Sequence, residues 1–115
     1  MGVASEKSRA FAIRIVRLYQ FLEKEKGEFI LSRQLLRSGT SIGANLAEAD
    51  YAVSRRDFLQ KISISLKEAA ETLYWLDLLY QTAYLTPQQY SSLKEDCSEL
   101  LKMLTSAVKT SKSGV

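Results

Sequence analysis

Residues 32–53 read SRQLLRSGTSIGANLAEADYAV, and the architecture depends on whether they form one helix or two pieces joined by a loop. Residues 38–43 have the small and polar composition of a loop. Apolar or small residues nevertheless continue through them at spacings of three and four, the period of one helix face. The positions are Leu35, Gly39, Ile42, Leu46, Ala49 and Val53. We therefore predict one helix over residues 32–53.

Small residues recur at every fourth position on one flank of this predicted helix: Gly39, Gly43 and Ala47. A glycine inside a helix costs about 1 kcal/mol relative to alanine, so close packing must offset the loss. We predict that these three residues and Asn45 serve helix packing. A polar stripe beside them is either a solvated face with hydrogen bonds along the helix or a specific contact surface: Arg37, Ser41, Asn45 and Glu48.

Three further segments show the helical period, and we predict helices over residues 5–26, 55–83 and 87–108. In the first, Ala12, Val16 and Tyr19 widen an apolar face made by Phe11, Ile15, Leu18 and Leu22. Ser54 with Asp57 resembles a capping box, and the Thr86-Pro87-Gln88-Gln89 run has a cap followed by proline at the first helical position. Gly27 is a plausible stop for the first helix. Residues 109–115 are small and polar, and we expect them to be frayed.

The length of 115 residues suits one domain, so we predict a single domain over residues 1–115. The chain has one proline, which favours long uninterrupted helices. Because the predicted helices are long and their links short, consecutive helices should be antiparallel. The predicted fold is all-α, an antiparallel up-down-up-down four-helix bundle.

The composition argues against catalysis and against a bound metal or cofactor. There is no histidine, which removes the commonest general base and metal ligand. Glu68 and Glu71 have the spacing of a di-iron carboxylate motif, but the motif needs histidine, so we interpret them as surface charge. Cys97, the one cysteine, falls on an apolar stripe and is interpreted as a buried hydrophobe. We expect no catalytic residue, no metal site and no cofactor.

The sequence also lacks the signals of membrane or secreted proteins. No stretch reaches the roughly 18 apolar residues of a membrane span. The first residues have no apolar core and do not form a signal peptide. We therefore expect a cytoplasmic protein that is not bound to a membrane.

The formal net charge of +3 is unevenly distributed. Residues 1–67 hold 12 Lys/Arg against 7 Asp/Glu, whereas residues 68–115 hold 4 against 6. All arginines lie in the first part, and arginine suits bidentate contact with phosphate. The predicted nucleic-acid-binding residues, from the first three helices, are Arg14, Arg17, Arg33, Arg37, Arg55 and Arg56. The simpler alternative is a solvated surface whose charges pair within the protein.

The third predicted helix carries more apolar surface than one buried stripe needs. Residues 73–80 read LYWLDLLY and are apolar on nearly every side. An exposed apolar patch of this kind marks an interface. We therefore predict a homo-oligomer with an interface at Tyr74, Trp75 and Leu78; the alternative is that the loop around Tyr84 and Leu85 covers this surface.

The residues also carry a family resemblance over essentially the whole chain. Residues 34–49, QLLRSGTSIGANLAEA, resemble the central motif of the bacterial four helix bundle protein family. Residues 54–59, SRRDFL, and 68–76, EAAETLYWL, resemble its third helix. The family includes proteins encoded by intervening sequences of large-subunit ribosomal RNA genes. It also includes the accessory variability protein of diversity-generating retroelements.

The resemblance implies an antiparallel four-helix bundle that assembles into a homopentamer. It also implies a basic surface that, in the retroelement member, contacts nucleic acid and a reverse transcriptase. The positions that match are Arg37, Asn45, Glu48, Arg55 and Arg56. Our hypothesis is a non-enzymatic homo-oligomer that binds RNA or DNA with low sequence specificity, with a reverse transcriptase as a further partner. The alternative hypothesis is a protein-interaction scaffold without nucleic-acid affinity.

Overall fold

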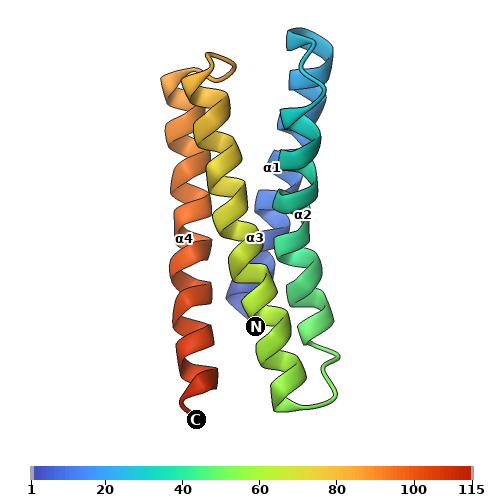
Figure 1. The fold of residues 1–115 in the computed structure, drawn as a ribbon, viewed down its shortest axis with the longest axis vertical. Coiled ribbons are helices and arrows are strands. Elements are labelled where there is room, and N and C mark those ends of the chain that lie inside the picture. Colours follow the sequence, from blue (N-terminus) through green and yellow to red (C-terminus); the bar gives the residue numbers. More distant parts are fainter. Residues whose placement is uncertain (1, 115) are drawn as a thin grey trace.

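The computed structural model describes residues 2–114 and contains four α-helices, with no β-strand in this part of the chain. They are α1 (Gly2–Lys26), α2 (Leu31–Ala49), α3 (Arg55–Gln81) and α4 (Pro87–Lys112). Each helix packs antiparallel to the next (Figure 1). The predicted up-down-up-down four-helix bundle is confirmed. Val115, the end of the tail expected to be frayed, lies outside the described residues, as does Met1.

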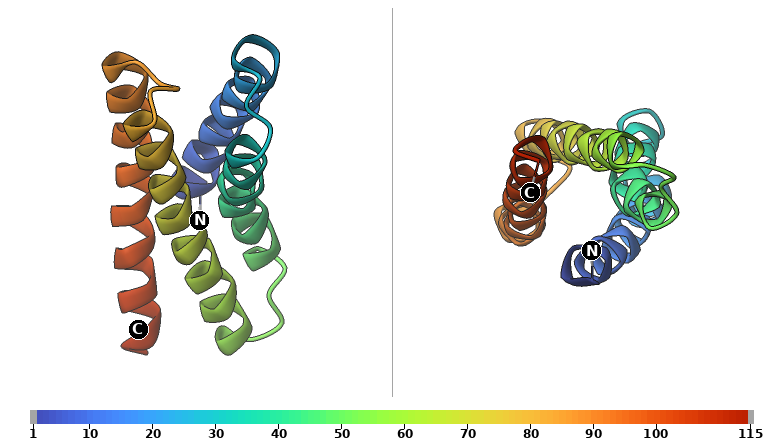
Figure 2. Two further views of the ribbon diagram at one scale, coloured as in Figure 1. Left: turned by 45° about the horizontal axis from the view of Figure 1, so that its top comes forward. Right: turned by 90° about the horizontal axis from the view of Figure 1, so that it is seen from below.

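The helices surround the core in sequence order, and among neighbouring helices α1 and α4 are the pair with the least contact (Figure 2). Two surface ion pairs join these two helices: Lys7 Nζ lies 2.6 Å from Glu99 Oε1, and Arg14 Nη1 lies 2.6 Å from Asp96 Oδ2. Beneath them lies the common core, in which all four helices bury apolar side chains. Its largest fully buried members are Phe11, Ile15, Leu22, Leu35, Ile42, Leu46, Ile62, Leu76, Leu79, Leu100 and Leu104.

The segment with loop-like composition, residues 38–43, is fully helical. Gly39 is buried where α1 passes closest, and a Cβ atom built on it would lie 2.8 Å from Ile15 Cγ2. A Cβ atom on Gly43 would lie 3.1 Å from Ser8 Oγ. The missing side chains therefore allow the close approach of α1 to α2, and this packing offsets the low helix propensity of glycine.

The beginning of α2 is held by a carboxylate that the sequence reading did not identify. Gly27, with φ 63°, ends α1 in the left-handed conformation. The next residue, Glu28, folds its side chain back over the first turn of α2. Its carboxylate accepts hydrogen bonds from the backbone N–H groups of Ile30, Leu31 and Ser32 at 3.2, 3.1 and 2.7 Å. These N–H groups would otherwise lack an acceptor at the start of the helix, so the Glu28 side chain caps the N-terminus of α2.

The Glu28 cap makes part of the stability dependent on pH. Burial raises the pKa of Glu28, but the hydrogen bonds from Ser32, Leu31 and Ile30 outweigh it and hold the pKa below its ordinary value of 4.5. A lowered pKa means that the cap stabilises the fold above about pH 4.5 and that this stability is lost as the pH falls through the folded-state pKa.

We expect Glu28→Gln to lower the free energy of unfolding by about 1 kcal/mol at pH 7, because the charged acceptor of three N–H groups is lost. The difference from the wild type should shrink as the pH falls below 4.5, because a growing fraction of Glu28 in the wild type is then protonated. Urea denaturation at pH 7 and at pH 3 measures it. An equal difference at both pH values would contradict a role for the charge.

The link between α2 and α3 is longer than predicted, because α2 ends at Ala49 and not at residue 53. Ser54 is extended, and its hydroxyl accepts from the N–H of Asp57 at 3.0 Å to cap α3. The Asp57 carboxylate in turn accepts from the N–H of Val53 at 3.2 Å. Because this cap takes the Val53 N–H, the last predicted turn of α2 cannot form, and Val53 is 90% exposed rather than on the apolar stripe.

Three other helix ends differ from the prediction by a few residues. α1 begins at Gly2, because Ala4 packs into the core. α3 ends at Gln81, because Ala83 takes a positive φ of 69°. α4 continues to Lys112 rather than ending at residue 108, and Val108 remains buried in it. The predicted capping box of Thr86 and Gln89 is present, with Pro87 in the first turn.

Candidate nucleic-acid interface

The six arginines predicted to bind nucleic acid do not form one surface. The molecule is 46 Å long. Arg33 lies in the first turn of α2, near the α1–α2 link, whereas Arg55 and Arg56 open α3 at the opposite end (Figure 1). Arg14, Arg17 and Arg37 lie between these ends. The arginines are therefore spread along the bundle.

Three of these arginines are paired with acids of the same chain. Arg14 pairs with Asp96 across the α1–α4 edge. Arg33 Nε lies 3.8 Å from the Glu23 carboxylate. Arg37 contacts Glu68 at 3.1 Å and also Glu71, and so ties α2 to α3. Because these three arginines already pair with acids of the same chain, they are weaker candidates for phosphate binding than unpaired cations.

The Arg37 cluster also explains Glu68 and Glu71. The side-chain hydrogen bond that Arg37 donates to Glu71 raises the pKa of Arg37. The Trp75 indole N–H donates to Glu71 at 2.9 Å, and this bond, with that from Arg37, lowers the pKa of Glu71. Both carboxylates are thus half-buried ion-pair partners of Arg37 on α2, which is a more specific role than the surface charge predicted from the sequence. Among residues 2–114 no group of three His, Cys, Asp or Glu side chains could hold a metal.

The polar stripe of α2 bonds partly along its own helix, through Ser41 and Asn45, and partly to α3, through Arg37 and Glu48. The Ser41 hydroxyl donates to the Arg37 carbonyl at 2.6 Å, and the Asn45 amide donates to the Ser41 carbonyl at 2.8 Å. Glu48 pairs with Lys61 of α3 at 2.9 Å. Asn45 makes no hydrogen bond to another helix within the described residues, so its predicted packing role stays a prediction.

A group of basic residues lies at the end of the bundle where α3 begins and α4 finishes. We call Arg55, Arg56, Lys109 and Lys112 the basic end. Arg55 Nη1 donates to the Gly114 carbonyl at 3.1 Å and so joins the start of α3 to the end of α4. Arg56, Lys109 and Lys112 are exposed and make no ion pair with residues 2–114. Their cations are therefore available to an anionic partner.

An exposed aromatic side chain accompanies the basic end. Tyr51 lies in the link that leads into α3 and is 86% exposed. The sequence reading missed Tyr51, Lys109 and Lys112, because it placed the first inside a helix and the other two in a frayed tail. The signal that could have found Tyr51 is the Ser54 cap, which requires extended backbone just before α3.

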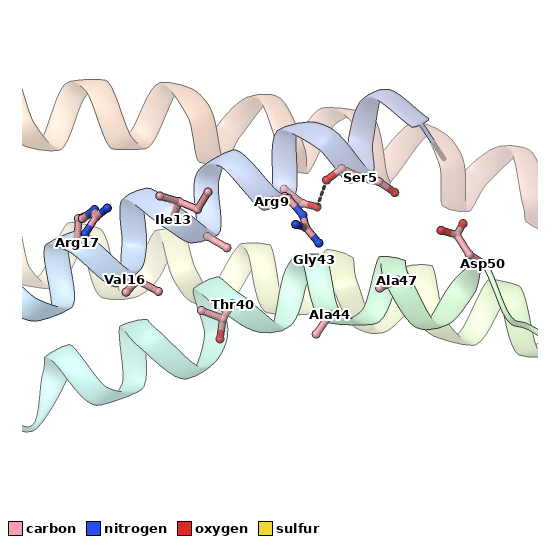
Figure 3. Close-up of a pocket in the computed structure, with 12 residues that line it drawn as sticks. Ser5, Arg9, Ile13, Val16, Arg17, Thr40, Gly43, Ala44, Ala47 and Asp50 are labelled. Carbon is pink, nitrogen blue, oxygen red and sulfur yellow. Dashed lines mark hydrogen bonds between the residues drawn. The ribbon is translucent and has the colours of Figure 1, made fainter.

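A groove of about 680 Å³ runs along the outer face between α1 and α2 (Figure 3). Gly43, Ala44 and Ala47 line its α2 side. Its α1 side carries Ile13, which is 55% exposed, and Val16, which is 36% exposed. Val16 thus lies at the surface, although the sequence placed it on the core-facing side. We call this feature the α1–α2 groove.

Charged residues border the α1–α2 groove. Arg9 and Arg17 lie on its α1 side, and neither makes an ion pair or hydrogen bond with residues 2–114. Asp50 lies at the end where Ser5 is found, and Arg17 lies at the other end (Figure 3). The groove is therefore mainly apolar, with positive charge along one side and an acid at one end.

Of the predicted oligomer interface, Tyr74 is the most exposed member, at 59%. Trp75 and Leu78 are half-buried, and the Trp75 ring packs edge-on against the Tyr74 ring at 5.0 Å. Tyr74 belongs to a line of exposed residues on α3 spaced four, three and four apart. We call this line the α3 ridge; it consists of Ala70, Tyr74, Asp77 and Gln81.

Cys97 is not placed for nucleophilic chemistry. Its side chain is buried in the core, and burial raises the pKa of its thiol to about 12. The thiol donates to the Ala69 carbonyl at 3.3 Å. The reactive form of cysteine is the thiolate, so this residue acts as a small apolar core residue. None of the helices within residues 2–114 is long and apolar enough to span a membrane.

The comparisons with known proteins agree on one family. The family model of the 23S rRNA-intervening sequence protein matches residues 3–106. The fold is similar to the crystal structure of a protein of unknown function from the S23 ribosomal protein family of Bacteroides thetaiotaomicron. The two share 55% sequence identity with a TM-score of 0.91, over 93% of this chain and 96% of that chain. No curated protein shows significant similarity to this chain.

Proposed function

The chain belongs to the 23S rRNA-intervening sequence protein family, and from this premise we propose that it is a homo-oligomer that binds nucleic acid through phosphate contacts. The observation that supports the proposal most is the basic end, where Arg56, Lys109 and Lys112 have no acid partner within the described residues. Self-assembly would place several basic ends on one particle, and affinity for nucleic acid rises with the number of phosphates neutralised.

The basic end suits single strands better than a duplex groove. Exposed Tyr51 offers an aromatic face on which a base can stack, beside cations that can contact the backbone. Both interactions tolerate any sequence, so binding should have low sequence specificity. RNA is the first ligand to test, because the family takes its name from an intervening sequence of 23S rRNA.

We expect Arg56→Glu with Lys112→Glu to weaken binding of a fluorescent single-stranded RNA about tenfold or more at low salt, because two phosphate contacts become repulsive. The matched control is Lys24→Glu with Lys94→Glu, which makes the same charge change toward the opposite end and should bind closer to the wild type. Fluorescence anisotropy at two salt concentrations, with RNA and DNA, gives the affinities and their salt dependence.

Equal losses in both double variants would show that net charge, and not the basic end, determines affinity. If the wild type binds neither RNA nor DNA at low salt, the protein-interaction scaffold becomes the better proposal. The α1–α2 groove is the surface that favours this second function, because its apolar lining suits a protein. The reverse transcriptase partner implied by the resemblance stays a prediction.

A further inference from the structure

A pocket of about 330 Å³ lies at the basic end of the bundle. It is lined by the end of α2, the α2–α3 link, the first turn of α3 and the last turn of α4. α1 begins farther from this end of the molecule than α3 does (Figures 1 and 2). The end of the core is therefore left open on the side where α1 would otherwise cover it. We call this feature the end pocket.

The wall of the end pocket is mainly apolar and comes from Ala49, Ala52, Val53 and Phe58. Ala49 is buried, Phe58 is half-buried against the core, and Val53 is almost fully exposed. Water thus meets apolar side chains on a concave surface, and covering them with an apolar group is favourable. The pocket suits one flat apolar group that contacts Phe58 and Val53 together.

The wall of the end pocket is held in place by the hydrogen bonds of the link. The Ala52 N–H donates to the carbonyl of the last residue of α2 at 3.1 Å, and the Val53 N–H donates to the Asp57 carboxylate at 3.2 Å. Arg55 also lines the pocket, and its hydrogen bond to the Gly114 carbonyl joins α3 to the end of α4. A ligand would therefore find the pocket already formed, which lowers the entropic cost of binding.

Two hydroxyl groups border the apolar wall, those of Ser54 and Ser111. The Ser54 hydroxyl accepts from the Asp57 N–H at 3.0 Å and can still donate its own hydrogen. The Ser111 hydroxyl makes no hydrogen bond with residues 2–114. Because a hydroxyl both donates and accepts, the two groups can bond to a ring that carries either donors or acceptors on its edge.

Three cations of the basic end lie close to the pocket in the sequence. Arg56 is two residues before Phe58, and Lys109 and Lys112 are on either side of Ser111 in α4. None of the three makes an ion pair with residues 2–114. A ligand whose ring enters the pocket therefore brings its other groups toward unpaired positive charge. A nucleotide within a strand has this chemistry, because its flat base is attached to a backbone with a phosphate on each side.

We propose that the end pocket holds one unstacked base of a single strand, while Arg56, Lys109 and Lys112 contact the neighbouring phosphates. The proposal rests on the nucleic-acid binding of the proposed function and gives the base a site of its own. Tyr51 does not line the pocket, so its exposed ring remains available to stack on the next base. A base in a duplex is paired and stacked, so the protein should prefer single strands.

An acidic peptide with one aromatic side chain combines a ring with negative charge as well, but it fits the site less well. The volume of the end pocket is near the lower limit of about 300 Å³ for small-molecule sites, so it has room for one ring system. Tyr51 provides a second flat surface in the same link. Successive bases of a strand can use both surfaces, whereas a peptide with one aromatic side chain uses only one.

Filling the end pocket without changing the charge tests the proposal. Ala52→Leu with Ser111→Leu places two larger side chains inside the pocket and leaves every cation in place. Fluorescence anisotropy at low salt compares an oligouridylate strand with a strand of the same length that has no bases. The wild type should bind the oligouridylate more tightly. The filled variant should lose about tenfold in affinity for the oligouridylate and keep its affinity for the strand without bases.

A matched variant and a second change in the pocket provide the controls. Ala10→Leu with Ser91→Leu adds the same two side chains at exposed positions outside the end pocket, so it should bind both strands like the wild type. Phe58→Leu keeps an apolar side chain but removes the ring, and it should lose about fivefold for the oligouridylate alone. Thermal denaturation shows whether each variant is folded at the temperature of the titration.

The outcomes separate the end pocket from the proposed function. If the wild type binds both strands equally well, no base is recognised, and the pocket proposal is overturned while phosphate binding stands. If filling the pocket lowers both affinities alike, or lowers neither, the pocket does not hold a base. A wild type that binds neither strand refutes both proposals, and binding of an acidic peptide with one phenylalanine would then assign the end pocket to a protein partner.

Discussion

Replacing Gly39 with leucine is expected to lower the free energy of unfolding by about 3 kcal/mol. A Cβ atom on this residue would lie 2.8 and 2.9 Å from the two γ-carbons of Ile15. Ile15 is completely buried, and its β-branched side chain has little freedom at χ1, so it cannot move aside cheaply. The better helix propensity of leucine recovers only about 1 kcal/mol. Thermal and urea denaturation measure the loss.

Gly43 provides the internal control for this prediction. Its added Cβ atom would lie 3.1 Å from the Ser8 hydroxyl, a tight contact that a small shift can relieve. Gly43→Ala should therefore be close to neutral, because the gain in helix propensity offsets the shift. Combining Gly39→Leu with Ile15→Ala should cost less than the sum of the two single changes. Additive costs would mean that the two side chains do not compete for space.

Arg37→Glu is expected to lower the free energy of unfolding by about 2 kcal/mol at low salt. The change removes the cation between Glu68 and Glu71 and puts a third carboxylate in its place. Salt screens repulsion among carboxylates that are partly exposed to solvent, as these are, so part of the loss should be recovered in 1 M NaCl. Urea denaturation at two salt concentrations measures the effect.

Arg37→Gln separates loss of attraction from added repulsion. It removes the ion pairs alone, which at an exposed site are worth about 1 kcal/mol or less. RNA affinity of the Gln variant should stay near that of the wild type, because Arg37 is engaged by α3 and lies away from the basic end. A large loss of RNA affinity in a folded Arg37→Gln protein would restore Arg37 to the binding surface and contradict its assignment as a structural tie.

The sequence was most informative where one local signal was sufficient. The spacing of three and four residues correctly predicts that α2 continues through residues 38–43. The Thr86 cap followed by Pro87 correctly predicts the first residue of α4. The C-terminal ends of α2 and α4 differ from the prediction. The apolar spacing predicts that Val53 belongs to α2. The capping hydrogen bonds of Ser54 and Asp57 instead keep Val53 outside the helix.

Ion pairs between residues far apart in the sequence could not be predicted from the sequence alone. Arg14 and Asp96 are 82 positions apart, and nothing local to either residue indicates that they meet. The α1–α2 groove was missed for a related reason. Ile13 and Val16 are exposed because close packing at Gly39 and Gly43 fixes the rotation of α1, and this rotation depends on the partner helix.

The order of helix contacts bears on how the chain folds during synthesis. The strong contacts all join helices that follow one another along the chain, and only the weaker α1–α4 edge joins its two ends. Each helix leaving the ribosome can therefore pack at once on the helix made just before it, and few contacts wait for distant residues. We therefore expect apolar surface to be covered one helix at a time, with the α1–α4 edge, which carries the ion pairs of Lys7 and Arg14, closing last.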